Sequence, residues 1–164
     1  MNHEESKLQQ QCVAWFRAQY PQYAMLLTHP INEGSGHTTT DRRRQGIHKA
    51  EGAVAGVPDL LLFMPSLFAT GDRAGLVCHG LGIEMKTKDG RQSQSQKDYQ
   101  KMLEAAWYGY VVVKSLDDFR SVVNAYISNA TTFTRQHIAA AHVEITQAAE
   151  QREKEKFYKI IGKK

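Results

Sequence analysis

The pattern of hydrophobic and polar positions predicts alternating helices and short strands along most of the chain. In residues 4–20, apolar positions recur at the i, i+4, i+7 and i+8 spacing of an amphipathic helix, and Pro21 ends that helix. The stripe expected to face inward consists of Leu8, Cys12, Trp15, Phe16 and Gln19. Apolar runs predict strands at 23–31, 59–64, 76–88 and 110–114, the last of them rich in β-branched residues.

Two further helices are expected, at 94–108 and from Ser115 to Tyr126. The first would pack through Tyr99, Met102, Leu103 and Ala106 and stop at Gly109, and the second opens with a capping box that ends at Asp118. The turn-rich stretch 65–75 favours an antiparallel hairpin, whereas a crossover helix between strands favours a parallel pair. The order predicts an α/β fold with a mixed four-stranded sheet flanked by helices (αβββαβ).

The chain is expected to divide into a domain over 1–128 and a polar helical extension over 129–164. The extension has one weak apolar stripe within 134–157, so it could be a helix docked on the domain, a dimerising arm or a partly disordered tail. Residues 32–55 lack apolar periodicity and predict a long loop with a short helix near 41–52. Loops of this length in compact domains are usually functional or disordered.

Composition narrows the possible functions only slightly. The 164 residues carry a net charge of +4, which raises the expectation of a polyanionic partner modestly. The candidate phosphate contacts are Arg42, Arg43, Arg44, Lys49, Lys88 and Arg91. The sequence has neither an apolar run of membrane-spanning length nor a signal peptide, so a cytoplasmic protein is expected. Cys12 and Cys78 have no metal-ligand spacing and are expected to be core residues.

The strongest chemical signal lies between residues 56 and 86. Asp59 enters one predicted strand, while Glu84 and Lys86 stand two apart on the next and therefore project from one face. If the strands pair, two carboxylates and one ammonium converge, which suits a divalent cation and a phosphate. The alternative is a surface ion pair at a frayed strand end, worth under about 1 kcal/mol.

These residues also form a family pattern. Gly-Val-Pro-Asp at 56–59, followed by Ile-Glu-Met-Lys at 83–86, resembles the PD-(D/E)XK nuclease superfamily with its restriction-endonuclease-like core. Three further segments resemble its virus-type replication-repair branch, VRR-Nuc: 5–9, 32–34 and 90–96. The spacing of the two acidic positions, Asp59 and Glu84, is long for that branch, and the tail after 128 has no counterpart.

The resemblance implies a Mg²⁺- or Mn²⁺-dependent DNA endonuclease that works as a homodimer on branched or Holliday-junction-like DNA in phage replication, recombination or repair. It implies catalytic roles for Glu5, Asp59, Glu84, Lys86 and Gln96. Asp59, Glu84 and the backbone carbonyl of Met85 would hold the metal, with Glu5 as an additional acid.

Several alternatives stay open. Glu5 could merely favour the positive end of its helix, and Gln96 also fits a capping box with Ser93. The protein could instead be a sequence-specific restriction-like nuclease, or a nucleic-acid-binding module that does not cut.

Overall fold

The computed structural model describes residues 3–30 and 46–161. They divide into a larger unit that ends at Ala130 and a smaller one that begins at Thr131. The motif at 32–34 and the three arginines at 42–44 lie outside the described residues. Of the predicted loop after residue 31, residues 46–50 are helical.

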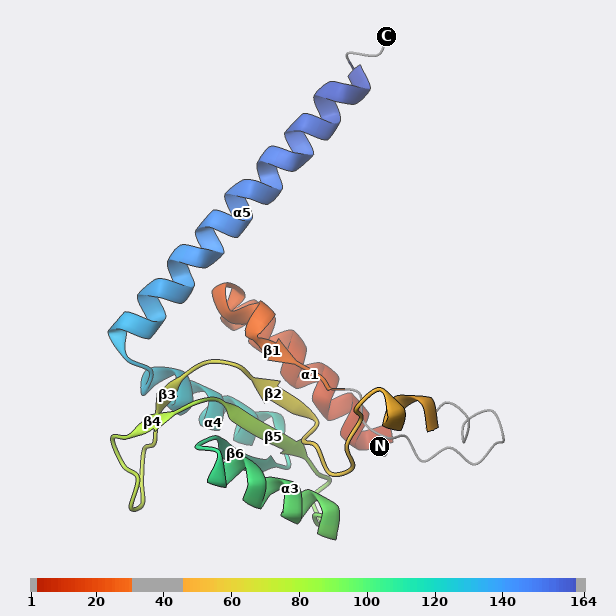
Figure 1. Ribbon diagram of the computed structural model, residues 1–164, viewed down its shortest axis with the longest axis vertical. Helices are drawn as coiled ribbons and strands as arrows, with labels where there is room; N and C mark the ends of the chain where they lie inside the picture. Colours follow the sequence, from red (N-terminus) through yellow and green to blue (C-terminus); the bar gives the residue numbers. More distant parts are fainter. Residues whose placement is uncertain (1–2, 31–45, 162–164) are drawn as a thin grey trace. The chain divides into compact units, whose positions relative to one another are not determined.

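Four short strands form the central sheet of the larger unit, in the order β1-β2-β5-β6 (Figure 1). β1 (Leu27–Thr28) and β5 (Leu81–Met85) each pair antiparallel with β2 (Leu60–Leu62). β6 (Gly109–Val113) runs parallel to β5 after the crossover helix α3 (Gln94–Ala105). The predicted mixed αβββαβ sheet is therefore confirmed.

The helices cover both faces of this sheet. α1 (His3–Gln19) contacts α4 (Leu116–Ser128), and α3 packs on β6 from the opposite side (Figure 1). Side chains alternate along a strand, so Ile83 and Met85 face the α1 and α4 layer while Glu84 faces α3. The fully buried side chains that fill the core include Phe16, Leu60, Leu62, Met64, Ile83, Met85, Val113, Phe119 and Val123.

The first predicted strand is largely wrong. Residues Pro21–Leu26 form a 3₁₀ helix, η1, and only Leu27–Thr28 are extended. Pro21 stands at the start of η1, where a helix needs no N–H and the fixed φ of proline is helical. The Tyr23 amide donates to the Tyr20 carbonyl and the two rings stack 6.0 Å apart, which turns the chain back beside α1.

Two helix stripes also need correction. In α1 the buried polar residue is Gln9, whereas Gln19 is exposed. In α3, Met102 is 71% exposed and Ala106 is exposed as well, because this helix rests on β6, an edge strand, and covers little of the sheet.

Helix α3 ends earlier than predicted. Trp107, not Gly109, takes the left-handed conformation after the helix, with φ +64°. The amide of Tyr108 donates to the Leu103 carbonyl and that of Trp107 to Glu104, which is the Schellman pattern. Gly109 instead begins β6, where a Cβ atom would lie 3.0 Å from the Leu81 side chain.

The connection between β2 and β5 contains a ribbon of its own. β3 (Ser66–Leu67) pairs antiparallel with β4 (Val77–Cys78), outside the main sheet. Arg73 in its loop lies 4.7 Å from the Trp107 ring centre and donates to the Glu104 carbonyl at 2.6 Å. These contacts join the loop to the end of α3, so the long connection leaves the main pairing undisturbed.

The smaller unit contains one helix, α5 (Thr132–Ile161), of 30 residues. Its few large apolar side chains are mostly exposed, including Phe133, Val143, Ile145, Phe157, Tyr158 and Ile160. In the described part of the chain, no helix combines the length and apolar character needed to cross a membrane.

The close approach of Gly56 to α3 gives a stability prediction. A Cβ atom on Gly56, whose φ is +87°, would lie 2.2 Å from the Ser95 carbonyl oxygen. Gly71→Ala is the matched control, because Gly71 has φ +78° but nothing within 4 Å of its Cβ position. We expect Gly56→Ala to lower the free energy of unfolding by about 2–4 kcal/mol and Gly71→Ala by about 1 kcal/mol, measured by urea denaturation. Equal losses would contradict the packing of Gly56 against α3.

Candidate functional site

The register of β2 and β5 brings the two predicted carboxylates together. Leu60 pairs with Ile83 in this antiparallel pair, so one step further Asp59 comes opposite Glu84. Opposite residues of an antiparallel pair project from the same face. Both side chains are buried, with Asp59 7% and Glu84 0% exposed. Lys86 is 8% exposed, so the alternative of a surface Glu84–Lys86 ion pair at a frayed strand end is excluded.

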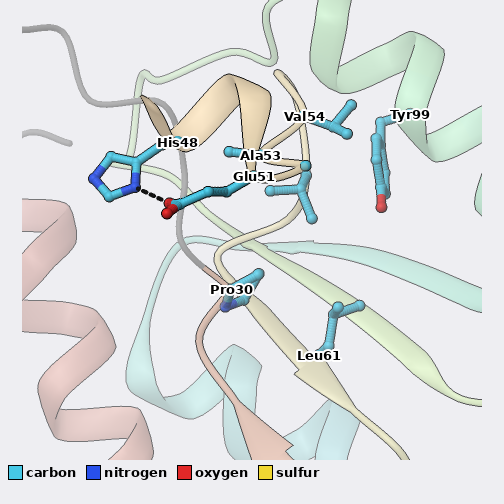
Figure 2. Close-up of a pocket in the computed structure, with 9 residues that line it drawn as sticks. Pro30, His48, Glu51, Ala53, Val54, Leu61 and Tyr99 are labelled. Carbon is cyan, nitrogen blue, oxygen red and sulfur yellow. Dashed lines mark ion pairs between the residues drawn. The ribbon is translucent and has the colours of Figure 1, made fainter. Parts of the chain in front are cut away.

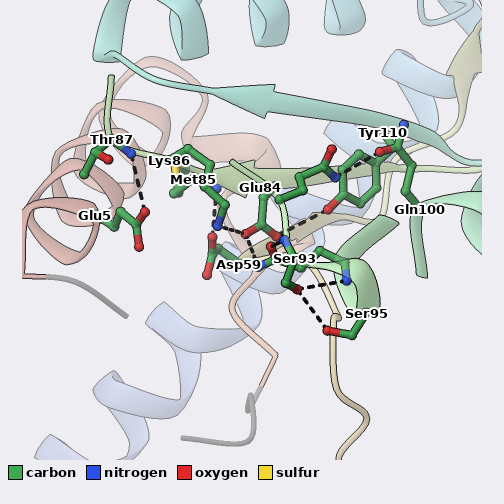
Figure 3. Close-up of polar contacts among 12 residues, drawn as sticks. Glu5, Asp59, Glu84, Met85, Lys86, Thr87, Ser93, Ser95, Gln100 and Tyr110 are labelled. Atoms are coloured by element: carbon green, nitrogen blue, oxygen red, sulfur yellow. Dashed lines mark hydrogen bonds and ion pairs between the residues drawn. The ribbon is translucent and has the colours of Figure 1, made fainter. Parts of the chain in front are cut away.

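Asp59 is held by hydrogen bonds from both neighbouring strands. Its Oδ2 accepts a hydrogen bond from the Met85 amide at 2.7 Å (Figure 3). Its own carbonyl oxygen lies 2.7 Å from Nδ1 of His29, just beyond β1. Three neighbouring strands therefore contribute to the position of one carboxylate.

Glu84 is held by donors from three different elements. Its Oε1 accepts from Lys86 Nζ, the next residue on the same face of the chain, and from Gln96 Nε2 of α3, both at 2.5 Å. Its Oε2 accepts from the Tyr110 hydroxyl of β6 at 3.3 Å (Figure 3). A buried carboxylate needs such partners, because an unpaired charge away from water costs several kcal/mol.

Gln96 contacts both Ser93 and Glu84. Its side-chain Oε1 accepts from the Ser93 backbone amide at 2.8 Å, and the Gln96 backbone amide donates to Ser93 Oγ. These two bonds complete a capping box. The other end of the same carboxamide donates to Glu84. The signal that starts α3 therefore also fixes one oxygen of the buried carboxylate.

In the described part of the chain, Asp59 and Glu84 lie in a region where acidic groups outnumber the basic groups that contact them. Burial raises the pKa of Glu84 to about 7, and the charge of Asp59 adds to that rise, while the hydrogen bond from Lys86 opposes it. Burial also raises the pKa of Asp59, which the Met85 amide and Lys86 oppose and the charge of Glu5 increases. Lys86 is itself buried, at 8% exposed. Among the described residues, Lys86 is the one cation that bonds to Asp59 or Glu84, and a further cation would lower the energy of this acidic cluster.

Glu5 lies at the rim of this cluster. It is half-buried in the first turn of α1, and its Oε1 lies 3.4 Å from the Thr87 amide just beyond β5. Its charge acts on Asp59. Glu5 therefore lies beside the paired carboxylates.

The predicted phosphate contacts are dispersed. Lys88 and Arg91 are exposed on either side of the turn between β5 and α3, close in sequence to Lys86 and Gln96. Lys49 is exposed in the helical segment 46–50.

Tyr110 was missed by the sequence reasoning, which took it as the first residue of an apolar strand. Its hydroxyl donates to Glu84 Oε2, and burial raises the pKa of that hydroxyl. The usable signal was Gly82, the residue paired with Tyr110. A Cβ there would lie 3.2 Å from the Tyr110 ring and 3.0 Å from Leu103, and glycine inside a strand often marks such a close approach.

A separate cleft of about 390 Å³ lies between the helical segment 46–50, the end of β1 and α3 (Figure 2). Pro30, Val54, Val57, Leu61 and Tyr99 form its mainly apolar lining, and His48 and Glu51 pair at 3.4 Å on its rim. None of the residues of the carboxylate cluster lines it.

Comparison with solved structures identifies the fold. A structure described as a "VRR_NUC domain protein" superposes with a TM-score of 0.60 and covers 79% of this chain and 93% of its own. The chain has the VRR-Nuc fold. Sequence identity between the two is 24%, so the likeness concerns the fold. No protein-family model and no curated protein matches the sequence.

The VRR-Nuc fold agrees with the resemblance seen in the motifs. The order of the elements and the mixed sheet are those expected, and the predicted residues Asp59, Glu84, Lys86 and Gln96 meet at one place in it. Within residues 3–30 and 46–161, no three His, Cys, Asp or Glu side chains gather closely enough to hold a metal ion by themselves.

The raised pKa of Glu84 gives a pH prediction for metal-free protein. The ordinary pKa of a glutamate side chain is 4.5, and that of Glu84 is about 7. Between pH 4.5 and about pH 7, the native state therefore keeps a proton on Glu84 that the unfolded state has released. The free energy of unfolding therefore falls as pH rises through this window, by at most about 3 kcal/mol. Urea denaturation with a chelator at pH 5 and pH 8 measures this fall.

The control for this prediction is Glu84→Gln, which cannot titrate. The difference in stability between wild type and variant should shift in favour of the variant as pH rises. A difference that is the same at both pH values would contradict the burial of an ionisable Glu84.

Proposed function

We propose that this protein is a metal-dependent DNA endonuclease that hydrolyses phosphodiester bonds at the Asp59–Glu84 pair. The observation that carries the proposal is the buried pair of carboxylates, Asp59 opposite Glu84, with the Lys86 ammonium bonded to Glu84, on a VRR-Nuc fold. Two acids buried side by side, with one lysine bonded to them among the described residues, cost free energy that a bound cation would reduce.

The donor set fits Mg²⁺ or Mn²⁺. Carboxylate and carbonyl oxygens are hard ligands, and Mg²⁺ keeps several waters and adds phosphate oxygens where the protein supplies few groups. Asp59, Glu84 and the Met85 carbonyl would provide the protein ligands, with Glu5 acting directly or through water. The ion would neutralise charge on the phosphate and lower the pKa of a bound water.

The chain's own residues would orient these groups. Lys86 Nζ lies 2.5 Å from Glu84 Oε1 and the Lys86 side chain is 10% exposed, so its ammonium could face a phosphate oxygen that gains charge in the transition state. Gln96 and Tyr110 hold the two oxygens of Glu84 from α3 and β6. Since these donors come from packed elements, the carboxylate would not need to reorganise during the reaction.

DNA is the proposed substrate, and branched DNA such as a four-way junction is the preferred form. A homodimer would place two such sites on two strands. Exposed Lys88 and Arg91 beside the site support a polyanionic substrate.

A nicking assay tests the proposal. With Mg²⁺ or Mn²⁺, wild-type protein should cut DNA, and Asp59→Asn and Lys86→Ala should each lower the rate at least about 100-fold, as the loss of a catalytic charge does. The controls are Asp72→Asn and Lys101→Ala, which remove the same charges from exposed positions. They should cut like wild type.

The substrate panel in this assay contains a four-way junction, a flap, plain duplex and single strand. Discrete fragments from mixed linear DNA would indicate a restriction-like enzyme. Binding that persists in chelator without product under either metal would indicate a module that does not cut. Wild-type rates for Asp59→Asn or Lys86→Ala would contradict the proposed site.

A further inference from the structure

Three lysines lie next to the carboxylates at the carboxyl end of β5. A small pocket of about 170 Å³ lies there, and its charged lining residues are Glu4, Glu5, Lys86, Lys88 and Lys114. Lys86 belongs to the site described above. Lys114 follows β6, and the sequence reasoning assigned it no contact with nucleic acid.

The parallel register places Lys114 beside Lys86. Met85 pairs with Val113, and the Lys86 amide donates to the Val113 carbonyl at 3.0 Å, so the two lysines follow on adjacent strands. Adjacent strands lie about 4.8 Å apart. Paired positions of parallel strands share a face, which puts Lys114 on the face of Lys86 and Glu84.

The ammonium of Lys114 is held in place. Its Nζ donates to the Lys88 carbonyl at 2.8 Å, and its backbone amide donates to Asp118 Oδ2 at 3.2 Å. An ammonium has three hydrogens, so the bond to Lys88 leaves two for another acceptor. Lys114 remains exposed, as does Lys88.

We propose that Lys88 and Lys114 bind a second phosphate of the DNA strand, the neighbour of the phosphate that lies at Asp59 and Glu84. The inference rests on the proposed function and adds the direction in which the strand leaves the site, past the ends of β5 and β6. Lys86 stands between the two phosphates.

Glu4 opposes this contact. It is exposed in the first turn of α1 and lines the same pocket as Lys114. Unlike Glu5, it has no place in the carboxylate cluster around Asp59. Removing its charge should therefore strengthen phosphate binding, which gives a variant with an effect opposite to the loss of Lys114.

The test is DNA binding as a function of salt, by fluorescence anisotropy with Ca²⁺ under conditions in which no product forms. Each phosphate contact contributes about 0.9 to the slope of log affinity against log salt. Lys114→Gln should make this slope shallower by about 0.9. If the variant and wild type bind equally at 1 M salt, the variant should then bind about eightfold more weakly than wild type at 0.1 M salt. Lys114→Arg should bind like wild type, and Glu4→Gln should bind more tightly.

Arg17→Gln is the matched control, because it removes one exposed positive charge near the other end of α1, about 18 Å along the helix from Glu5.

A DNA strand with a neutral methylphosphonate in place of the phosphate next to the mapped cut should weaken wild-type binding as Lys114→Gln does. It should not weaken that variant further.

The outcomes separate this inference from the proposed function. If wild type binds and cuts DNA but Lys114→Gln has the slope of Arg17→Gln, the second phosphate site is wrong and the nuclease stands. If wild type binds without cutting, the slope still decides the inference while cleavage fails. If wild type binds no DNA, both are overturned.

Discussion

The larger unit depends on keeping the carboxylate of Glu84 buried in the middle of a sheet. Such a charge is tolerated only if hydrogen bonds and opposite charge replace the water that it loses. Here the replacements come from Lys86 just beyond β5, Gln96 of α3 and Tyr110 of β6. The pairing of β5 with β6 and the docking of α3 are therefore tied to one side chain.

This constraint explains features that would otherwise be costly. Gly82 leaves room for the Tyr110 ring, and Gly56 lets the segment before Asp59 pass against the first turn of α3. Both glycines stand where a side chain would push a Glu84 donor away from its acceptor. Packing and site chemistry are thus satisfied by the same residues, as expected when a site is built on rigid elements.

The sequence allowed the sheet, the helices and the meeting of Asp59, Glu84 and Lys86 to be predicted, because those follow from strand periodicity and from the alternation of side chains. It did not reveal the turn at Pro21, since an apolar run is compatible with a strand or with a helical turn. It also did not reveal that Tyr110 donates a hydrogen bond to Glu84, because this contact depends on the pairing of Tyr110 in β6 with Gly82 in β5. The dual role of Gln96 needed coordinates, because a capping pattern says nothing about the free end of the carboxamide.

If the buried acids form a cation site, calorimetric titration should detect Mn²⁺ binding to chelator-treated protein. Binding to wild type and to Asp72→Asn should be saturable, and the affinity of Asp59→Asn should be at least about tenfold lower, or 1.4 kcal/mol. Equal Mn²⁺ affinity in wild type and Asp59→Asn, or no binding to folded wild type, would contradict this site.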